Sequence, residues 1–297
     1  MVDIRLKVFR SVAQNLSFTK ASQELYISQP AISKHIQELE AEYHVRLFDR
    51  LGNRISLTHA GQLLLDHCQR IFSDYRHLDF EMNALRKKYS GEIRIGASTT
   101  ISQYVMPEIL ADFVQQYPQT SISVLSGNSR DIEAALQGGK IDIGMVEGII
   151  RQPQLKYSAF MKDELVAIVS AENVLVDKDE ITISELQNTP LVLREHGSGT
   201  LDVVENALQN KGLSLSEMKI VMYLGSTESI KGFIAHSNSM GIVSVRSVSK
   251  ALLNGEFKVI EIKGLKMERE FCFVEKRGES SGMQTVFKKF ITSGYRL

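Results

Sequence analysis

The sequence of 297 residues predicts two parts: an N-terminal, all-α winged helix-turn-helix with a long linker helix, and a C-terminal α/β domain of two lobes. Three observations predict this fold class. They are short helical segments separated by a tight turn, an apolar seam of heptads, and short apolar strands that alternate with helices from about residue 92. With 43% hydrophobic and 24% charged residues, the composition is typical of a folded globular protein, and the length is too great for one ordinary core.

Charge and cysteine usage limit the possible partners and compartment. The formal net charge is zero, but residues 1–88 carry 13 Lys and Arg against 10 Asp and Glu, while the remainder carries 22 against 25. This asymmetry supports DNA binding only weakly. Cys68 and Cys272 lie far apart, without metal-ligand spacing, which favours a reducing cytoplasm and two buried apolar side chains. Neither a secretory signal nor a membrane span is evident, so we expect a cytoplasmic, nucleoid-associated protein without a membrane partner.

A helix that begins at Ser28 is the centre of the N-terminal part. Ser28 is a good N-cap, and Pro30 falls in the first turn, where its missing N–H costs nothing. The helical period separates an apolar inward face from a polar outward face that suits base edges and phosphates in the major groove of DNA. The inward face consists of Ile32, Ile36 and Leu39, with Ala31 beside them, and the outward face of Gln29, Ser33, Lys34 and Gln37.

Two helices precede this one. The first is predicted over residues 4–15 and the second over residues 20–25, where Phe18 and Thr19 resemble a hydrophobic staple and an N-cap. Together with the Ser28 helix, they form the helix-turn-helix plan.

A short β-hairpin, the wing, is predicted after these helices. Residues 45–48 and 54–57 alternate around Gly52-Asn53, a dipeptide suited to a tight hairpin turn. Arg50 and Arg54 lie on this wing, where a guanidinium can enter the minor groove or contact phosphate. We therefore expect a winged helix-turn-helix, the DNA-binding domain, over residues 1–58.

A long amphipathic helix is predicted after Thr58, whose hydroxyl can cap it. Apolar residues recur at steps of four and three, the a/d pattern of a coiled coil: Leu64, Cys68, Ile71, Tyr75, Leu78, Met82 and Leu85. A single apolar seam favours pairing with a second copy, which also suits a DNA site of two half-sites. The alternative is an ordinary surface helix packed on its own domain. We expect a dimerising linker helix over residues 59–89.

The chain from 90 to 297 alternates strands and helices, as expected for parallel-rich sheets flanked by helices. Strands are predicted at 92–96, 121–126, 141–146, 164–169, 191–193, 220–224, 241–244, 259–262 and 268–275, and helices at 101–117, 129–138, 199–211, 228–237 and 282–293. We expect lobe I over about 90–162 and 268–297, and lobe II over about 163–267. Ligands in such folds bind outside the carboxyl ends of the strands.

Four segments resemble the N-terminal signature of LysR-type transcriptional regulators: residues 17–22 (SFTKAS), 27–36 (ISQPAISKHI), 45–50 (VRLFDR) and 57–61 (LTHAG). The resemblance implies a winged helix-turn-helix joined by a dimerising linker helix to an effector domain with a periplasmic-binding-protein fold, usually in a tetramer. It implies that Gln29, Pro30, Ser33, Lys34 and Gln37 face the groove of DNA and that Arg50 and Arg54 belong to the wing. With the N-cap Ser28, these are the expected DNA-binding residues. His44 departs from the family, which usually has glycine at this helix end, and a non-glycine residue at positive φ costs about 1 kcal/mol.

One hydroxyl-rich segment follows a strand in each lobe: residues 96–101 (GASTTI) and 195–200 (EHGSGT). Hydroxyls and free N–H groups at a helix start can bind an anion such as a carboxylate, a phosphate or a sulfur oxyanion. The candidate effector-binding residues are Ser98, Thr99, Thr100, Asn128, Arg194, Ser198, Gly199, Thr200, Ser226 and Thr227. The alternative is that these residues only cap helices. The segment GASTTISQYVMP also resembles the branch of the family that regulates carbon fixation and sulfur assimilation, which implies a small anionic metabolite.

Motifs for catalysis and cofactors are incomplete. Gly138-Gly-Lys140 lacks the first glycine of a P-loop, because Ala134 occupies that position. Ser198 lacks the flanking glycines of a nucleophile elbow. No two histidines have the helical spacing of zinc ligands around a glutamate. We therefore expect no enzyme, no metal and no cofactor, and a small anionic effector as the bound ligand.

These observations predict a sequence-specific DNA-binding transcriptional regulator whose activity a small anion between the two lobes modulates. The expected partners are double-stranded DNA with an inverted-repeat promoter site, the effector, and further copies of the chain as a homodimer through the linker helix and as a homotetramer. RNA polymerase is a further candidate partner. The alternative is a solute-binding or enzymatic α/β protein whose N-terminal domain only mediates protein contacts, but the sequence shows neither a signal peptide nor a catalytic constellation.

Overall fold

The chain forms two compact units, Met1–Gly91 and Glu92–Leu297. The structure is a computed structural model, and it describes residues 3–51, 54–85, 91–278 and 282–295. Within these ranges, no helix combines the length and the apolar character needed to cross a membrane.

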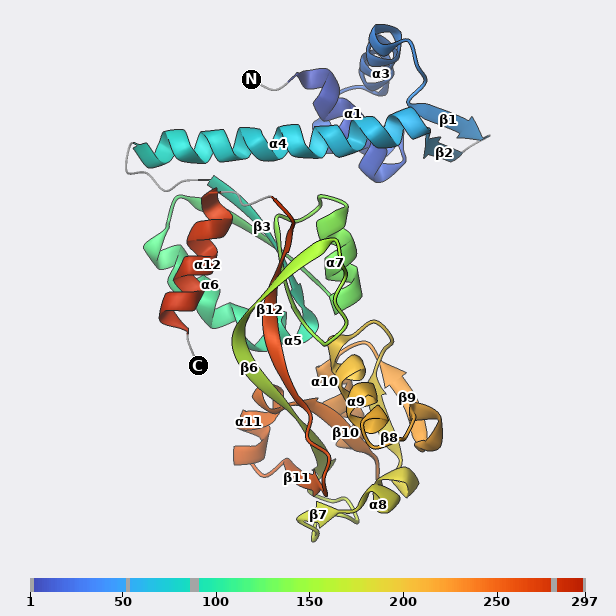
Figure 1. The fold of residues 1–297 in the computed structure, drawn as a ribbon, viewed down its shortest axis with the longest axis vertical. Helices are drawn as coiled ribbons and strands as arrows, with labels where there is room; N and C mark the ends of the chain where they lie inside the picture. The colour runs from blue at the N-terminus through green and yellow to red at the C-terminus, as the bar shows by residue number, and fades with distance from the viewer. Residues whose placement is uncertain (1–2, 52–53, 86–90, 279–281, 296–297) are drawn as a thin grey trace. The chain divides into compact units, whose positions relative to one another are not determined.

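The N-terminal unit is the predicted winged helix-turn-helix with a long helix after it (Figure 1). Its elements are α1 (Ile4–Asn15), α2 (Phe18–Leu25), α3 (Gln29–Tyr43), β1 (Phe48–Leu51), β2 (Arg54–Leu57) and α4 (His59–Leu85). The predicted inward face of α3 is buried: Ile32, Ile36 and Leu39 pack with Phe9 and Val12 of α1 in one core. This packing fixes which face of α3 is left for solvent.

Side-chain caps determine where the helices of this unit begin. Ser28 accepts a hydrogen bond from the N–H of Ala31 at 3.4 Å, and a proline lies in the first turn of α3, as predicted. The Thr58 hydroxyl accepts one from the N–H of Gly61 at 2.9 Å, ahead of α4. The predicted N-cap Thr19 of α2 was wrong, because Ser17 caps this helix and α2 begins at Phe18.

Glu40 ties the wing to α3. Its carboxylate accepts hydrogen bonds from the N–H groups of Leu47, at 2.8 Å, and Phe48, at 3.4 Å. Because the Leu47 N–H is engaged there and its side chain is buried, residues 45–47 form a connection, and the predicted strand at 45–48 was wrong except for its last residue. The turn Gly52-Asn53 and the side chains of Arg50 and Arg54 lie outside the described part of the structure.

The first half of α4 packs on its own domain. Leu65, Cys68 and Phe72 belong to the core of the N-terminal unit, and the guanidinium of Arg10 lies 4.0 Å from the centre of the Phe72 ring. Burial raises the pKa of the Cys68 thiol to about 11. The expected burial of Cys68 is confirmed, and at this position the helix packs on its own domain, as the alternative interpretation of the seam expected. Further along the helix, the side chains of Leu78 and Met82 are about half exposed, at 50% and 53%.

The C-terminal unit has the two predicted α/β lobes. Lobe I contains β3 (Gly91–Ser98), β4 (Thr120–Gly127), β5 (Ile143–Glu147), α5 (Thr99–Tyr104), α6 (Met106–Gln116), α7 (Ser129–Gln137) and α12 (Gly282–Gly294). Strands β3 and β5 are parallel. Helices α6 and α12 lie against each other (Figure 1), where the rings of Phe113 and Phe287 are 5.1 Å apart between centroids.

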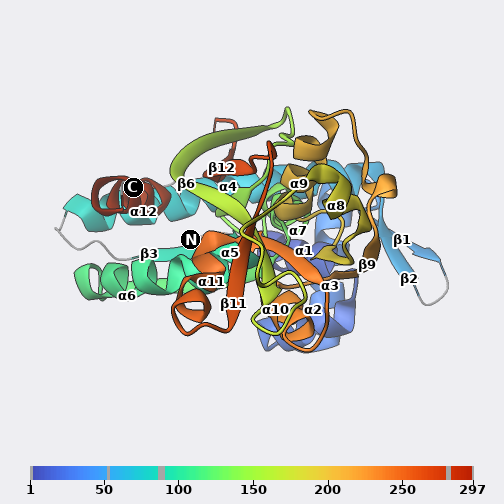
Figure 2. The same cartoon turned by 90° about the horizontal axis from the view of Figure 1, so that it is seen from below.

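Lobe II has helices on both faces of its strands (Figure 2). It contains β7 (Glu180–Ile181), β8 (Leu191–Arg194), β9 (Ile220–Leu224), β10 (Met240–Ser244), β11 (Phe257–Ile262), α8 (Ile183–Asn188), α9 (Gly199–Gln209), a 3₁₀ turn (Leu215–Glu217), α10 (Thr227–Ile234) and α11 (Val245–Leu253). Helices α8 and α9 cover one face and α10 and α11 the other. Strand β8 is parallel to β9 and β10.

Two long antiparallel strands connect the lobes. Strands β6 (Leu155–Ser170) and β12 (Glu268–Lys276) pair from Leu155–Lys276 to Glu164–Glu268 and run through both lobes (Figure 1). The strand order β4-β3-β5-β12-β6-β10-β8-β9 places them in the middle of one continuous sheet. Any change in the angle between the lobes must therefore bend or twist these two strands.

Some predicted elements differ from the structure. The helix predicted at 101–117 is two helices, α5 and α6, that meet at Val105. The next-but-one residue is Pro107, which lacks an N–H and clashes with the preceding turn in a helix interior, so it lies in the first turn of a new helix. Helices α8 and α11 were not predicted, and β6 begins at Leu155, well before the predicted residue 164.

His44 ends α3 in the left-handed conformation, as the departure from glycine suggested. Its φ is 54° and its ψ 33°, and its side chain is exposed. Replacing His44 by glycine should relieve this strain and stabilise α3 by about 0.5–1 kcal/mol, the left-handed penalty less the entropy cost of glycine. Native-state hydrogen exchange of the α3 amides measures this change. His44→Ala is the matched control, because it keeps the Cβ; equal protection in the two variants would contradict the assignment of strain.

Candidate functional site

The outward face of α3 carries the predicted DNA-binding side chains together. Gln29, Pro30, Lys34 and Gln37 are exposed and Ser33 is half-buried. The Lys34 ammonium lies 4.0 Å from the Glu38 carboxylate, a weak surface pair that leaves the ammonium available for phosphate. Together with the exposed N-cap Ser28, these residues form one polar surface of hydrogen-bond donors and acceptors.

Tyr26 is a surface residue that the sequence analysis missed. It ends α2 in the left-handed conformation, at φ 53°, and its side chain is 94% exposed in the turn before α3. An aromatic residue in a turn that favours glycine or asparagine is the signal that would have identified it.

Four of the predicted effector residues cap helices. The Ser98 hydroxyl accepts from the N–H of Ile101 at 3.3 Å and the Ser198 hydroxyl from that of Leu201 at 3.2 Å. Asn128 and Ser226 cap α7 and α10 in the same way. These groups hold the helix starts in place, as the alternative interpretation of the segments expected.

Three other predicted residues carry buried donors without a partner among the described residues. The hydroxyls of Thr99 and Thr100 and the Nη1 atom of Arg194 have no hydrogen-bond partner there. The side chain of Arg194 is 1% exposed, and its other nitrogens bond the Glu195 carboxylate, at 2.8 and 2.9 Å, and the carbonyl of Gly225, at 3.3 Å. Since an unsatisfied buried donor costs about 1–3 kcal/mol, these three groups favour an oxygen-rich ligand.

The two lobes touch where β5 and α9 meet. A Cβ on Gly199 would lie 1.9 Å from the carbonyl oxygen of Glu147, so only glycine allows this approach. The N–H of Arg130 in lobe I donates to the carbonyl of Gly197 in lobe II at 3.2 Å. This seam includes the end of β5 and the starts of α5, α7 and α9. It places the predicted residue Asn128 beside Gly197, two residues before the predicted Gly199.

A second contact across the seam involves residues that the sequence analysis missed. The Tyr104 hydroxyl of α5 donates to the Glu228 carboxylate of α10, and burial, with this contact, raises the pKa of Tyr104 well above its usual range. The Lys231 ammonium lies 2.6 Å from the same carboxylate and 5.6 Å from the centre of the Tyr104 ring. Glu228 follows the predicted Thr227 directly, so the two lobes are linked beside the candidate site.

A buried ion pair lies where β6 and β12 cross from one lobe to the other. The Arg269 Nε atom is 2.7 Å from the Asp163 carboxylate, and neither side chain has exposed surface. Arg269 also donates to the Thr200 hydroxyl at 2.9 Å and lies 3.7 Å from the Glu147 carboxylate. The hydroxyl of Thr200, a predicted effector residue, is therefore engaged by Arg269.

Family models match both units of the chain. The model of the LysR substrate binding domain matches residues 86–293, and that of the bacterial regulatory helix-turn-helix protein, lysR family, matches residues 5–62. The chain belongs to the LysR family of transcriptional regulators. It is thus a DNA-binding transcriptional regulator with an effector-binding domain, as the sequence predicted.

Relatives and solved structures are similar to this LysR chain over most or all of its length. CysL, an HTH-type transcriptional regulator of Bacillus subtilis, is 29% identical over 292 residues, 98% of this chain and 97% of the relative. A full-length OxyR variant of Pseudomonas aeruginosa is similar in fold, with a TM-score of 0.76 at 18% identity, over 100% of this chain and 95% of that one. The regulatory domain of Synechocystis CcmR, solved in complex with 2-PG, is 25% identical with a TM-score of 0.62, over 68% of this chain and 96% of that one.

Asp202 lies in the first turn of α9, half-buried beside the seam. Burial raises the pKa of its carboxyl to about 6; Arg130 opposes this rise, and Glu205, Glu133 and Glu147 add to it. A raised carboxyl pKa means that the folded LysR chain loses stability as the pH rises from about 4 through about 6.

Replacing Asp202 by asparagine should therefore stabilise the protein above pH 6 and leave it nearly unchanged at about pH 4. The gain at neutral pH should be about 1–2 kcal/mol, because partial solvent exposure screens the carboxylate. Urea unfolding of both proteins across this pH range measures it. Glu172→Gln, which removes an exposed carboxylate elsewhere in lobe II, is the control. A stability difference between the Asp202 variant and the parent protein that does not change with pH would contradict the assignment.

Proposed function

We propose that this LysR regulator reads an inverted-repeat promoter site in double-stranded DNA, and that a small anionic metabolite at the seam between the lobes controls its activity. The effector proposal depends above all on the three buried donors of Thr99, Thr100 and Arg194, which have no partner among the described residues and lie after β3 and at the end of β8. In α/β folds, ligands bind outside the carboxyl ends of the strands. The wider effector set also includes Ser98, Asn128, Ser198, Gly199, Thr200, Ser226 and Thr227.

The exposed face of α3 supports the DNA-binding part of the proposal. Gln29 and Gln37 can each give and accept hydrogen bonds at base edges, and Lys34 can contact phosphate. Arg50 and Arg54 would contact the minor groove or the backbone from the wing. Recognition of bases would thus come from α3 and much of the salt-dependent affinity from Lys34 and the wing.

We also propose the domain division and assembly that the sequence suggested: DNA-binding residues 1–58, a linker helix at 59–89, and a regulatory domain at 90–297. The half-exposed Leu78 and Met82 on α4 support pairing of two chains through the linker helix. Two such dimers would form a tetramer, act on the nucleoid in the cytoplasm and contact RNA polymerase.

An anion at the seam would act by favouring one arrangement of the lobes. Arg194 belongs to lobe II and the two threonines to lobe I, so a ligand that contacts both stabilises their closed arrangement. The similar CcmR regulatory domain was solved in complex with 2-PG, and this complex supports a small anionic ligand for the present chain as well. A change in lobe closure would alter the spacing of the DNA-binding domains in the dimer and the bend they impose on DNA.

Replacing Gln29 by alanine should relax the base preference at one position of each half-site by about 1–3 kcal/mol. The reason is that a base-edge hydrogen bond is lost while phosphate contacts remain, so the salt dependence of binding should not change. Fluorescence anisotropy with the protein's own upstream DNA and single-base variants at two salt concentrations measures both. Gln209→Ala, at an exposed position of α9, is the control. An unchanged base preference in the Gln29 variant would refute its role.

Replacing Thr100 by valine should weaken binding of 2-PG by about tenfold or more, because it removes the hydroxyl and keeps the shape of the side chain. Isothermal titration of the full-length protein measures the change. Thr120→Val is the matched control, since the Thr120 hydroxyl is also buried without a described partner but begins β4, away from the seam. Equal affinity of the two variants for 2-PG would count against the seam as the anion site.

A further inference from the structure

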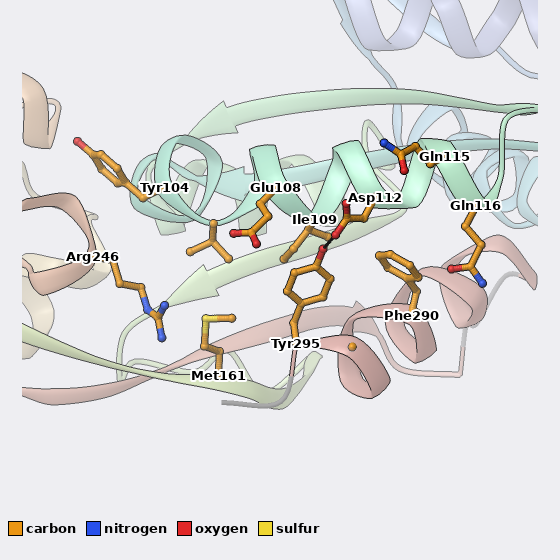
Figure 3. Close-up of a pocket in the computed structure, with 12 residues that line it drawn as sticks. Tyr104, Glu108, Ile109, Asp112, Gln115, Gln116, Met161, Arg246, Phe290 and Tyr295 are labelled. Atoms are coloured by element: carbon orange, nitrogen blue, oxygen red, sulfur yellow. Dashed lines mark hydrogen bonds between the residues drawn. The ribbon is translucent and has the colours of Figure 1, made fainter. Parts of the chain in front are cut away.

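A groove of about 770 Å³ lies along α6, between this helix, the end of α12 and the connecting strand β6 (Figure 3). None of the predicted effector residues lines it. Arg246, from the first turn of α11, lies at one end, so the groove extends from lobe I to the edge of lobe II. A ligand in this groove would therefore contact both lobes outside the seam.

Arg246 has unused hydrogen-bonding capacity. A guanidinium has five N–H donors, and the one hydrogen bond from the Arg246 side chain in the described structure is that of Nη2 to the carbonyl of Lys162, at 3.3 Å. Its Nε atom is buried without a hydrogen-bond acceptor among the described residues and lies 3.8 Å from the Asp163 carboxylate. With 30% of the side chain exposed, this guanidinium can receive a carboxylate in the bidentate arrangement that both groups favour.

Glu108 supplies a negative charge in the groove, opposite in sign to that of Arg246. Its side chain is exposed on α6 and has no hydrogen-bond or ion-pair partner in the described residues. Figure 3 shows its carboxylate and the Arg246 guanidinium directed toward the same space beside Met161. The other carboxylate of the groove, Asp112, already accepts a hydrogen bond from the Tyr295 hydroxyl. The groove therefore holds one available anion and one available cation.

Apolar and aromatic side chains line the groove beside these two charges. Ile109 and Met161 are buried, and Phe290 and Tyr295 present aromatic rings from the end of the chain (Figure 3). The thioether of methionine makes favourable contacts with aromatic rings, so Met161 suits an aromatic ligand. Since Glu108 and Asp112 outnumber Arg246, a ligand that carries only a carboxylate is disfavoured relative to one that also carries an ammonium group.

We propose that this groove is a second ligand site of the regulator and binds a small zwitterion with an aromatic body, of the class of aromatic amino acids and short peptides. The ligand carboxylate pairs with Arg246, its ammonium group with Glu108, and its ring packs on Met161 and Tyr295. The site differs from the proposed anion site at the seam in its residues and in its ligand chemistry.

Binding in the groove would also act on the buried ion pair between the lobes. Arg246 faces Asp163, which accepts hydrogen bonds from Arg269 and from Ser244, the N-cap of α11, both at 2.7 Å. A carboxylate that draws Arg246 toward the groove removes positive charge from the neighbourhood of Asp163. The second ligand would thereby change the environment of the strands that connect the lobes.

The test uses full-length protein and three probes that differ by one charge: L-phenylalanine, hydrocinnamate, which lacks the ammonium group, and phenethylamine, which lacks the carboxylate. Glycyl-L-phenylalanine serves as the longer zwitterion. Ligand-observed NMR and calorimetry should show that a zwitterion binds about tenfold more tightly than either singly charged analogue. Glu108→Gln should abolish the preference over hydrocinnamate, and Arg246→Gln the preference over phenethylamine.

Glu261→Gln is the matched control, because Glu261 is exposed on β11 and distant in sequence from the groove. If the Arg246 variant fails to fold, the Glu108 variant alone is enough to test the proposal. The proposal is overturned if neither zwitterion binds at about 10 mM, if all probes bind equally, or if Glu108→Gln behaves like the control. Retained 2-PG binding in the Glu108 variant would separate failure of this site from failure of the site at the seam.

Discussion

The buried ion pair of Arg269 and Asp163 constrains the whole regulatory domain. It joins β6 and β12 where these strands cross between the lobes, and both side chains are without exposed surface. Burying two charges is costly unless further hydrogen bonds satisfy them. Here Thr200 and Ser244, both of lobe II, each supply one such bond, while the Nη2 atom of Arg269 has no partner among the described residues. Removing one partner would leave a buried charge and cost about 3–5 kcal/mol. The lobes can therefore change their angle only in ways that keep this pair intact.

At the helix starts beside the seam, some residues cap the helix and their neighbours are left to bind a ligand. Ser98 and Ser198 use their hydroxyls to cap α5 and α9, so these groups hold the backbone in place. Thr100, the second residue of α5, leaves its buried hydroxyl unpaired among the described residues. A ligand at the seam can therefore bind without breaking the hydrogen bonds that cap these helices. The scaffold stays rigid, and binding satisfies groups that are otherwise unpaired.

Local signals in the sequence predicted the N-terminal unit better than the site between the lobes. Ser28 caps α3 because capping depends on residues three positions apart. The heptad pattern was misleading at Cys68, since an apolar seam does not specify whether its own domain or a second chain covers it. Asp163 and Arg269 are 106 positions apart, and their pairing follows from the antiparallel register of two strands, which composition and spacing do not encode. Tyr104 and Glu228, which link the lobes, are a pairing of the same long-range kind.

Arg246 links the two proposed ligand sites through the buried ion pair of Arg269 and Asp163. It begins α11, whose N-cap Ser244 donates to Asp163, and Asp163 in turn holds Arg269 against Thr200 at the start of α9. A ligand that binds one arrangement of these groups more tightly than another shifts the equilibrium between them. Because such coupling is reciprocal, a zwitterion in the groove would alter the affinity for an anion at the seam by the same factor as the anion alters the affinity for the zwitterion.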